Sequence, residues 1–300
     1  MKLSCQTRNT TQSTAPIAMR AHGFVAALLL LFSTQLAALE LPQESRVPGG
    51  IALIPLNTLD SSTAPSAWYR SQRVMVVPSA DTRFANQAKW LAVIGIPLSA
   101  KADQEQLMKA DGVRFPFRIQ DKAYTEQRLT ITNKRHVNPE KQDLERYKRE
   151  KAEMTAAFTH WSEPPSPHLR FVLPAEGRFS SPFGLKRFFN DQPRNPHSGL
   201  DIAGGQGGAI TAPATGTVLT VGDYFFNGKT VIVDHGQGLT TMYCHMSRID
   251  VQPGDQLNRG DSIGAIGKTG RVTGPHLHWS VSLNNTRVDP LLFTEAQHGE

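Results

Sequence analysis

Cysteine is nearly absent from this chain of 300 residues, which contains only Cys5 and Cys244. Cys5 lies in an N-terminal stretch that we expect to be removed, so Cys244 is left alone and cannot form an internal bridge. A disulfide framework is therefore excluded. Internal repeats and low-complexity segments are also lacking, while a hydrophobic content of 39% is typical of a globular protein.

A strong excess of charge of one sign is lacking as well. The formal net charge is +6, but the first 38 residues hold Lys2, Arg8 and Arg20 and no acid, so the rest of the chain has 29 basic and 26 acidic side chains. This balance is too mild to indicate a nucleic-acid partner.

No apolar run is long enough to span a bilayer comfortably. The longest, Gly23–Phe32, follows Arg20 and precedes the small residues Ala37 and Ala38. This arrangement predicts an export signal over residues 1–38, with Met19 as the start, against the alternative of an uncleaved anchor. We expect a periplasmic or secreted protein with no stable membrane span after signal removal.

The sequence predicts a mostly β protein. Apolar, β-prone runs separated by proline and glycine indicate a β-sandwich-like domain over residues 40–134. The predicted strands are Gly50–Leu56, Arg73–Pro78, Trp90–Leu98, Val113–Ile119 and Glu126–Thr132.

A helix and linker are expected over residues 135–168, where Asn138 can cap the helix and Pro139 suits its first turn. Helical spacing places an apolar stripe on one side, formed by Leu144, Tyr147, Met154 and Phe158. The charged residues around the stripe, Glu150 among them, indicate a solvated face. Residues 169–293 are glycine-rich and predict a compact, mostly antiparallel β domain, followed by a tail at 294–300.

Histidines collect in this last domain. His276 and His278 stand two residues apart before an apolar run, so on a strand both imidazoles lie on one face. Upstream, His197 and Asp201 are four apart among glycines and a proline, which makes a helix implausible there. Two histidines and a carboxylate form a recurrent open zinc site, whereas a hydrogen-bonded turn pair is the alternative for His197 and Asp201.

A third histidine, His245, ends the run Leu239–His245. Alternation places Tyr243 and His245 on one face and Cys244 on the other, towards the core, where a thiol acts as a small hydrophobe. No electropositive setting is indicated that would make Cys244 a nucleophile.

Together these motifs supply one histidine more than a three-ligand site uses, which suits hydrolysis, since water on a metal needs a proton acceptor. The spacing leaves open which of His245, His276 and His278 binds metal.

The ordered motifs His-x-x-x-Asp, Tyr-x-His and His-x-His, set among these glycines from Gly177 to Phe293, resemble the LytM/lysostaphin family of zinc metallopeptidases. The resemblance implies a β-rich peptidase domain over residues 169–293 that cleaves peptide cross-bridges of bacterial peptidoglycan. It also implies one Zn²⁺ per chain. The segment Ala123–Glu153 is similar to the N-terminal β domain that precedes the peptidase in some exported Gram-negative members.

Carried over by position, the resemblance implies His197, Asp201 and His278 as zinc ligands and His245 and His276 as the catalytic pair. Phe183 occupies the position where a tyrosine that donates a hydrogen bond to the oxyanion would be expected. Stem peptides and cross-bridges would be the partners, and the N-terminal domain could autoinhibit the enzyme. The alternatives are a peptidoglycan carboxypeptidase or amidase, a non-catalytic activator of another cell-wall hydrolase, or a biotinyl- or lipoyl-type carrier, for which Lys268 lacks the usual flanking methionines.

Overall fold

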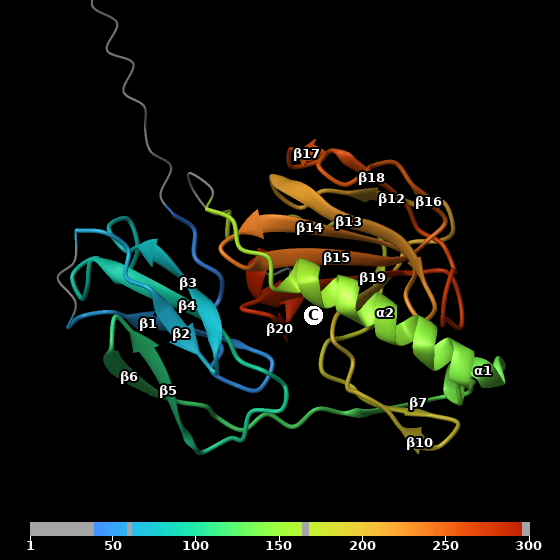
Figure 1. Ribbon diagram of the computed structural model, residues 1–300, viewed down its shortest axis with the longest axis horizontal. Helices are drawn as coiled ribbons and strands as arrows, with labels where there is room; N and C mark the ends of the chain where they lie inside the picture. Colours follow the sequence, from blue (N-terminus) through green and yellow to red (C-terminus); the bar gives the residue numbers. More distant parts are fainter. Residues whose placement is uncertain (1–38, 59–61, 164–167, 296–300) are drawn as a thin grey trace, which may run out of the picture. The chain divides into compact units, whose positions relative to one another are not determined.

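The computed structural model describes residues 39–58, 62–163 and 168–295, which belong to one compact unit (Figure 1). Among these residues, no helix has the length and apolar character that crossing a membrane requires. Several expectations fall outside the described residues: the export signal, the start at Met19, Cys5, residues 164–167 of the linker and residues 296–300 of the tail.

Strands dominate the described residues, so the expectation of a mostly β protein is confirmed. The N-terminal strands form a six-stranded sheet in the order β1-β4-β3-β2-β5-β6. They are β1 (Ile51–Pro55), β2 (Ala67–Tyr69), β3 (Gln72–Pro78), β4 (Trp90–Gly95), β5 (Glu105–Ala110) and β6 (Val113–Arg118). The sequence did not predict β2 and β5. Polar Gln106 occupies an inward position of β5 and hides its alternation, because its side chain accepts a buried hydrogen bond from the Tyr69 hydroxyl (2.8 Å).

The last strand expected in this module pairs elsewhere. β7 (Glu126–Leu129) lies parallel to β9 (Lys186–Phe189) in a three-stranded sheet that β10 (Gln192–Pro193) completes. Only half-buried and exposed residues make up β7, so it has no apolar face to add to the N-terminal sheet. The segment after the module therefore runs alongside the C-terminal domain.

The helical connector begins later than expected. Asn138 does not cap the long helix; it ends the short helix α1 (Lys134–Val137), which Asn133 caps by accepting a bond from the Arg135 amide (3.1 Å). The long helix α2 (Lys141–Phe158) starts after Glu140, whose amide donates to the Asp143 carboxylate (3.1 Å). The predicted cap was wrong because Asn138 and Pro139 lie in the turn between the two helices.

The buried face of α2 also differs from the predicted stripe. Leu144 is 51% exposed, whereas Glu150 is buried and accepts bonds from Arg146 (2.6 Å) and from the Phe225 amide (2.9 Å). The end of the helix packs on the C-terminal sheet through Ala157, Phe158, Ile232, Met242 and Cys244. The helix therefore covers one face of that sheet (Figure 1).

The C-terminal domain is built on an eight-stranded sheet in the order β17-β13-β14-β15-β19-β11-β8, with β20 beside β19. Its strands are β8 (Arg178–Ser181), β11 (Leu200–Ala203), β13 (Gly216–Tyr224), β14 (Gly228–Gly236), β15 (Leu239–Met246), β17 (Gln256–Leu257), β19 (Leu277–Leu283) and β20 (Thr286–Val288). A smaller sheet contains β12 (Ala209–Thr211), β18 (Ser262–Ala265) and β16 (Arg248–Ile249), and a 3-10 helix, η1 (Pro290–Phe293), follows β20.

The two faces of the large sheet have different roles. Tyr243 pairs with Trp279 across β15 and β19, and both side chains lie in the main apolar core. The next pair, Cys244 and His278, points to the opposite face, the one that α2 covers. The candidate site lies on this second face. The domain boundaries drawn from the sequence stay a prediction.

Candidate metal and catalytic site

Two of the candidate residues meet through strand pairing. Asp201 in β11 lies directly opposite His278 in β19. His197 reaches them from the loop before β11, where Gly199 allows a close approach: a Cβ on Gly199 would lie 2.5 Å from the Trp279 oxygen and 2.8 Å from His278 Cε1. The glycine therefore lets the entry to β11 lie against β19.

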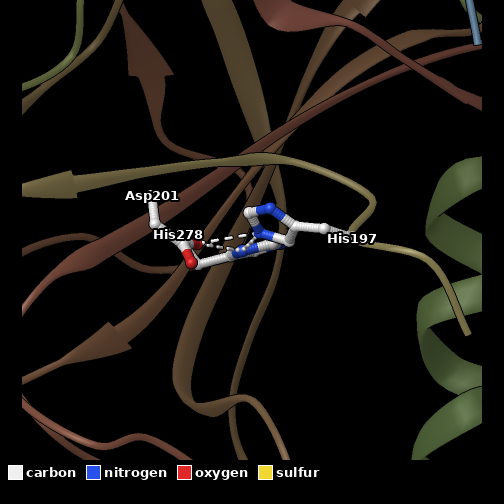
Figure 2. Close-up of side chains that lie close together, drawn as sticks. All are labelled: His197, Asp201 and His278. Carbon is white, nitrogen blue, oxygen red and sulfur yellow. Dashed lines mark hydrogen bonds and ion pairs between the residues drawn. The ribbon is translucent and has the colours of Figure 1, made fainter. Parts of the chain in front are cut away.

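Three side-chain atoms converge at this point (Figure 2). His197 Nε2 lies 2.9 Å from Asp201 Oδ1 and 3.0 Å from His278 Nδ1, and His278 Nδ1 lies 2.7 Å from the same oxygen. All three residues are buried. The expected ligand set is thus brought together in space.

The hydrogen-bond partner of the other ring nitrogen shows which nitrogen of His197 and of His278 carries the proton and which has a lone pair. His197 Nδ1 faces the Pro182 carbonyl (2.7 Å), which can only accept, so Nδ1 donates and Nε2 has the lone pair. His278 Nε2 faces Ser280 Oγ (3.0 Å), which donates its own proton to the Ser198 carbonyl (2.9 Å). Consequently His278 Nδ1 also presents a lone pair.

Two imidazole lone pairs and a carboxylate oxygen therefore face one another. Acceptors at such distances repel unless a cation lies among them. Two histidines and one carboxylate are a usual set for zinc, at bonds of about 2.0–2.1 Å. The donor set fits such an ion.

The second oxygen of Asp201 is held separately. Arg187 donates from Nη2 to Asp201 Oδ2 (2.9 Å) and from Nε to Gln127 (3.1 Å). The Arg187 guanidinium next to this buried carboxyl group favours its ionised form. The carboxyl group is therefore ionised at neutral pH.

His245 reaches the site through a bulge in β15. Lys229 pairs with Met246 and Val231 with Tyr243, so Cys244 and His245 together oppose one residue of β14. His245 has a φ of 65°, in the left-handed region. The expectation that Tyr243 and His245 share a face is therefore wrong, because the bulge turns His245 onto the face of Cys244 and His278.

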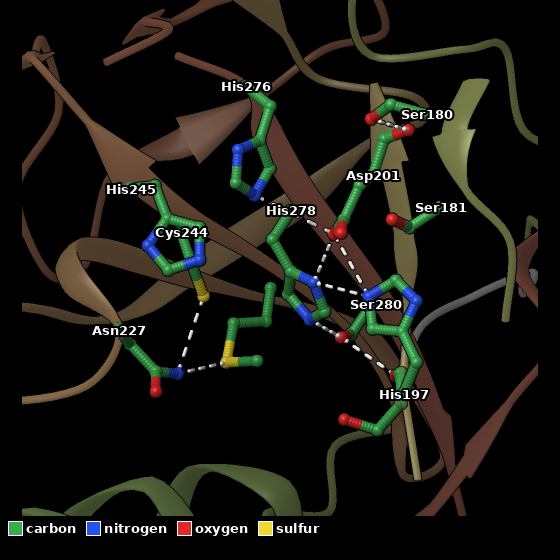
Figure 3. A network of polar contacts seen from close by, with 12 residues as sticks. Ser180, Ser181, His197, Asp201, Asn227, Cys244, His245, His276, His278 and Ser280 are labelled. Atoms are coloured by element: carbon green, nitrogen blue, oxygen red, sulfur yellow. Dashed lines mark hydrogen bonds and ion pairs between the residues drawn. The ribbon is translucent and has the colours of Figure 1, made fainter. Parts of the chain in front are cut away.

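His245 and His276 lie beside the three converging residues (Figure 3). Their ring centroids are 4.9 Å apart, and His276 Nε2 lies 3.9 Å from Asp201 Oδ1. Each Nδ1 faces a backbone carbonyl at 2.9 Å, of Thr269 for His245 and of Gly274 for His276. Each Nε2 therefore has its lone pair available towards the site.

Burial keeps the imidazoles of His278 and His245 neutral. It lowers the pKa of His278 to about 4, and together with the nearby His278 and His276 it lowers the pKa of His245 well below its usual value. A neutral imidazole can bind a metal or accept a proton, whereas a protonated one can do neither.

Cys244 is fully enclosed, and burial raises the pKa of its thiol to about 12. It therefore lacks the thiolate that nucleophilic attack requires, as expected. Phe183 is buried with its ring centroid 6.4 Å from that of Tyr124, whose hydroxyl donates to the Pro48 carbonyl (2.7 Å). Neither side chain donates into the site.

Sequence reasoning missed two residues that orient the site. Ser280 follows His278 by two positions, so period-two alternation could have found it on the same face. Arg187 comes from β9, 14 residues before Asp201, and belongs to no motif. Only the folded chain shows that it binds Asp201.

Comparisons with known proteins agree with this geometry. A family model described as Peptidase family M23 matches residues 195–290, and one described as Peptidase family M23 N-terminal domain matches residues 44–122. A crystal structure described as a peptidase M23 from Pseudomonas aeruginosa is 42% identical, covers 83% of this chain and 95% of that chain, and superposes with a TM-score of 0.66.

Curated relatives match over a shorter stretch. Peptidoglycan DD-endopeptidase ShyA of Vibrio cholerae is 34% identical over 41% of this chain and 29% of that protein. DD-carboxypeptidase/endopeptidase Mpg of Neisseria meningitidis is 36% identical over 38% of this chain and 26% of that protein. The chain thus spans under a third of the length of these relatives.

Proposed function

Because the chain belongs to peptidase family M23, we propose that it is an exported zinc metalloendopeptidase that hydrolyses peptide cross-links of bacterial peptidoglycan. The membership confirms the resemblance to LytM/lysostaphin-type peptidases. The observation that carries the proposal is the convergence of two imidazole lone pairs and one carboxylate oxygen beside two further histidines. The names of three curated relatives from Vibrio cholerae, described as peptidoglycan DD-endopeptidases, support peptidoglycan as the substrate.

His197, Asp201 and His278 would hold one zinc ion. A bound zinc ion acts as a Lewis acid, which acidifies water and polarises a carbonyl group. Arg187 fixes the Asp201 carboxylate through Oδ2, which leaves Oδ1 directed at the metal position. Ser280 accepts the proton of His278 Nε2 in a hydrogen bond, which leaves the lone pair of His278 Nδ1 directed at the metal position.

His245 and His276 would move protons. Each imidazole holds its Nδ1 proton on a backbone carbonyl and presents a free Nε2 towards the site. One Nε2 can take a proton from the attacking water, and the protonated ring can then donate to the oxyanion or to the leaving amine. This division of roles follows the family resemblance.

The test is metal content together with activity on purified peptidoglycan. We would compare the chain that starts at Leu39 with its His278→Ala variant. One zinc per chain and release of uncross-linked muropeptides, both lost in the variant, are the expected results. No bound zinc and no cleavage would contradict the proposed hydrolase and favour a non-catalytic activator, whereas bound zinc without cleavage would indicate autoinhibition or a different substrate.

A carboxypeptidase is the second candidate, because one set of relatives is described as DD-carboxypeptidase/endopeptidase. Mass analysis of the released fragments separates the two reactions, since a carboxypeptidase frees single terminal residues. Cleavage between glycan and stem would instead identify an amidase.

Autoinhibition by the segment before the helices is a further part of the proposal. Gln127 in β7 donates to Ser181 (2.8 Å) and accepts from Arg187, at the edge of the cavity that Asp201 and His276 line. Gln127→Ala removes both bonds and should raise the rate on peptidoglycan if the segment covers the groove. An unchanged rate would show that the Gln127 side-chain bonds do not restrict access to the groove.

A further inference from the structure

A cavity of about 380 Å³ opens beside the candidate site, between the C-terminal sheet and the helical connector. His197, His245 and His278 line the side nearest the metal position. The lining also contains three arginines and no aspartate or glutamate: Arg187, Arg194 and Arg271. The cavity is thus rich in fixed positive charge and lacks its own negative charge.

Arg271 is the most confined of the three. Its guanidinium lies over the rings of Phe189 (4.8 Å) and Phe226 (4.3 Å) and donates from Nη1 to the His136 carbonyl (3.2 Å). Within residues 39–58, 62–163 and 168–295, no carboxylate pairs with it. Burial and the charges of Arg187 and Arg194 lower its pKa to about 10, so it stays protonated at neutral pH.

The neighbouring arginines do not offset this charge. Arg194 donates to the carbonyls of Pro193 (2.9 Å) and Val137 (2.8 Å) and to Gln192 Oε1 (2.7 Å), all of them neutral acceptors. Arg187 has one carboxylate partner, Asp201, whose other oxygen faces the metal position. Of the three guanidinium groups, only that of Arg187 therefore has a carboxylate partner among the described residues. A bound metal would add further positive charge.

A largely buried cation without an anionic partner is unfavourable, and an anion that enters the cavity relieves the imbalance. The guanidinium is planar and forked, so it matches a carboxylate with two parallel hydrogen bonds. The contacts with the Phe189 and Phe226 rings restrict where the Arg271 guanidinium can lie. The cavity also adjoins the reacting centre, so a group bound in it belongs to a residue next to the cleaved bond.

We propose that this cavity is a carboxylate-binding subsite, and that Arg271 selects substrates with a free carboxylate next to the scissile peptide bond. The inference rests on the proposed peptidase function and specifies its substrate class. The carboxylate can be the terminal group of the peptide or an acidic side chain. Both present the same chemistry to Arg271.

The experiment measures binding by the zinc-loaded full chain, so it does not depend on turnover. The probes are uncleavable peptides in which a ketomethylene group replaces the scissile amide. One pair is acetyl-D-alanyl-D-alanine with a free or an amidated terminus. The other is amidated D-glutamyl-D-alanine and its D-glutaminyl counterpart. Titration calorimetry compares the wild type with Arg271→Gln and with Arg259→Gln, an exposed arginine outside the cavity.

We expect the wild type to bind one acid form about 10-fold or more tightly than its amide, as hydrogen bonds between charged groups typically give. Arg271→Gln should reduce this preference to about 2-fold, whereas Arg259→Gln should keep it. Whichever pair shows the preference identifies the terminal or the side-chain source. Arg271→Lys keeps the charge without the fork and should show an intermediate preference.

Equal binding of acid and amide in both pairs would overturn the proposal, and so would a full preference in Arg271→Gln. Zinc content and thermal unfolding of each variant show whether it is folded; if Arg271→Gln is not, the Arg271→Lys result decides. A chain that prefers the acid form but leaves peptidoglycan intact would retain the subsite and refute the endopeptidase.

Discussion

Ser280 offers a sharp test of how the candidate metal site is oriented. It is 1% exposed, and its hydroxyl connects His278 Nε2 (3.0 Å) to the Ser198 carbonyl (2.9 Å). Ser280→Ala removes the acceptor that keeps the proton on Nε2 and the lone pair on Nδ1. Loss of such a partner typically lowers metal affinity by about 10–100-fold, or roughly 1.4–2.7 kcal/mol.

Competition with a chromophoric chelator measures the zinc affinity of the metal-free chain. Ser282→Ala is the matched control, because Ser282 is also buried in β19 but its hydroxyl accepts a bond from Arg287 (3.3 Å) and makes no hydrogen bond to His278. We expect Ser280→Ala to weaken zinc binding while Ser282→Ala leaves it unchanged. Equal affinity in both variants and the wild type would refute the reasoning that the serine fixes the ligand tautomer.

Three further predictions concern the site, its pH dependence and the core. Asp201→Ala should lose zinc and activity together, whereas His245→Ala should keep zinc and lose about 100-fold or more in rate; an empty site in the second variant would contradict the assigned roles. Burial lowers the pKa of His235 to about 4, so its neutral form stabilises the fold above pH 6.5 and that contribution is lost as the pH falls through 4. When the pH falls from 7 to 4, the free energy of unfolding should decrease by up to about 3 kcal/mol less in His235→Gln than in the wild type, as denaturant titration measures it. An equal decrease in both proteins would contradict this. The Asn284 side chain accepts a hydrogen bond from the Gly95 amide (2.6 Å) and donates one to the Gly95 carbonyl (3.1 Å), so it joins the two large sheets. Asn284→Ala should therefore lower the free energy of unfolding in urea by about 2–4 kcal/mol. A decrease under about 0.5 kcal/mol would contradict this.

Much of the candidate site could be predicted because its signals are local. Alternation placed His276 and His278 on the same side of one strand, and both lie beside Asp201 in the structure. The motif around His197 indicated a loop rather than a helix, and the structure agrees. Which histidines bind metal could not follow from spacing, because it depends on which ring nitrogens the fold brings next to the Asp201 carboxylate.

Other features depend on contacts between distant segments. The stripe on α2 predicted a buried Leu144, but the sheet beneath presents the Phe225 amide, which bonds to Glu150 instead. β7 was assigned to the N-terminal module because it follows that module in the chain, whereas its hydrogen-bonding partner β9 lies about 60 residues further on. Neither partner can be identified from the segment's own periodicity.

The bulge in β15 shows why one residue of the site escaped a period-two prediction. Regular alternation from Tyr243, which must lie in the core opposite Trp279, would send His245 into the core as well. One extra residue opposite Thr230 lets β15 keep Tyr243 in the core and still direct His245 to the site. The left-handed φ of 65° that this requires costs about 1–2 kcal/mol for a residue other than glycine. Bonds from the His245 amide to the Asn227 carbonyl (2.9 Å) and from Nδ1 to the Thr269 carbonyl (2.9 Å) offset that cost. The same contacts that stabilise the strained backbone therefore also leave His245 Nε2 free for proton transfer.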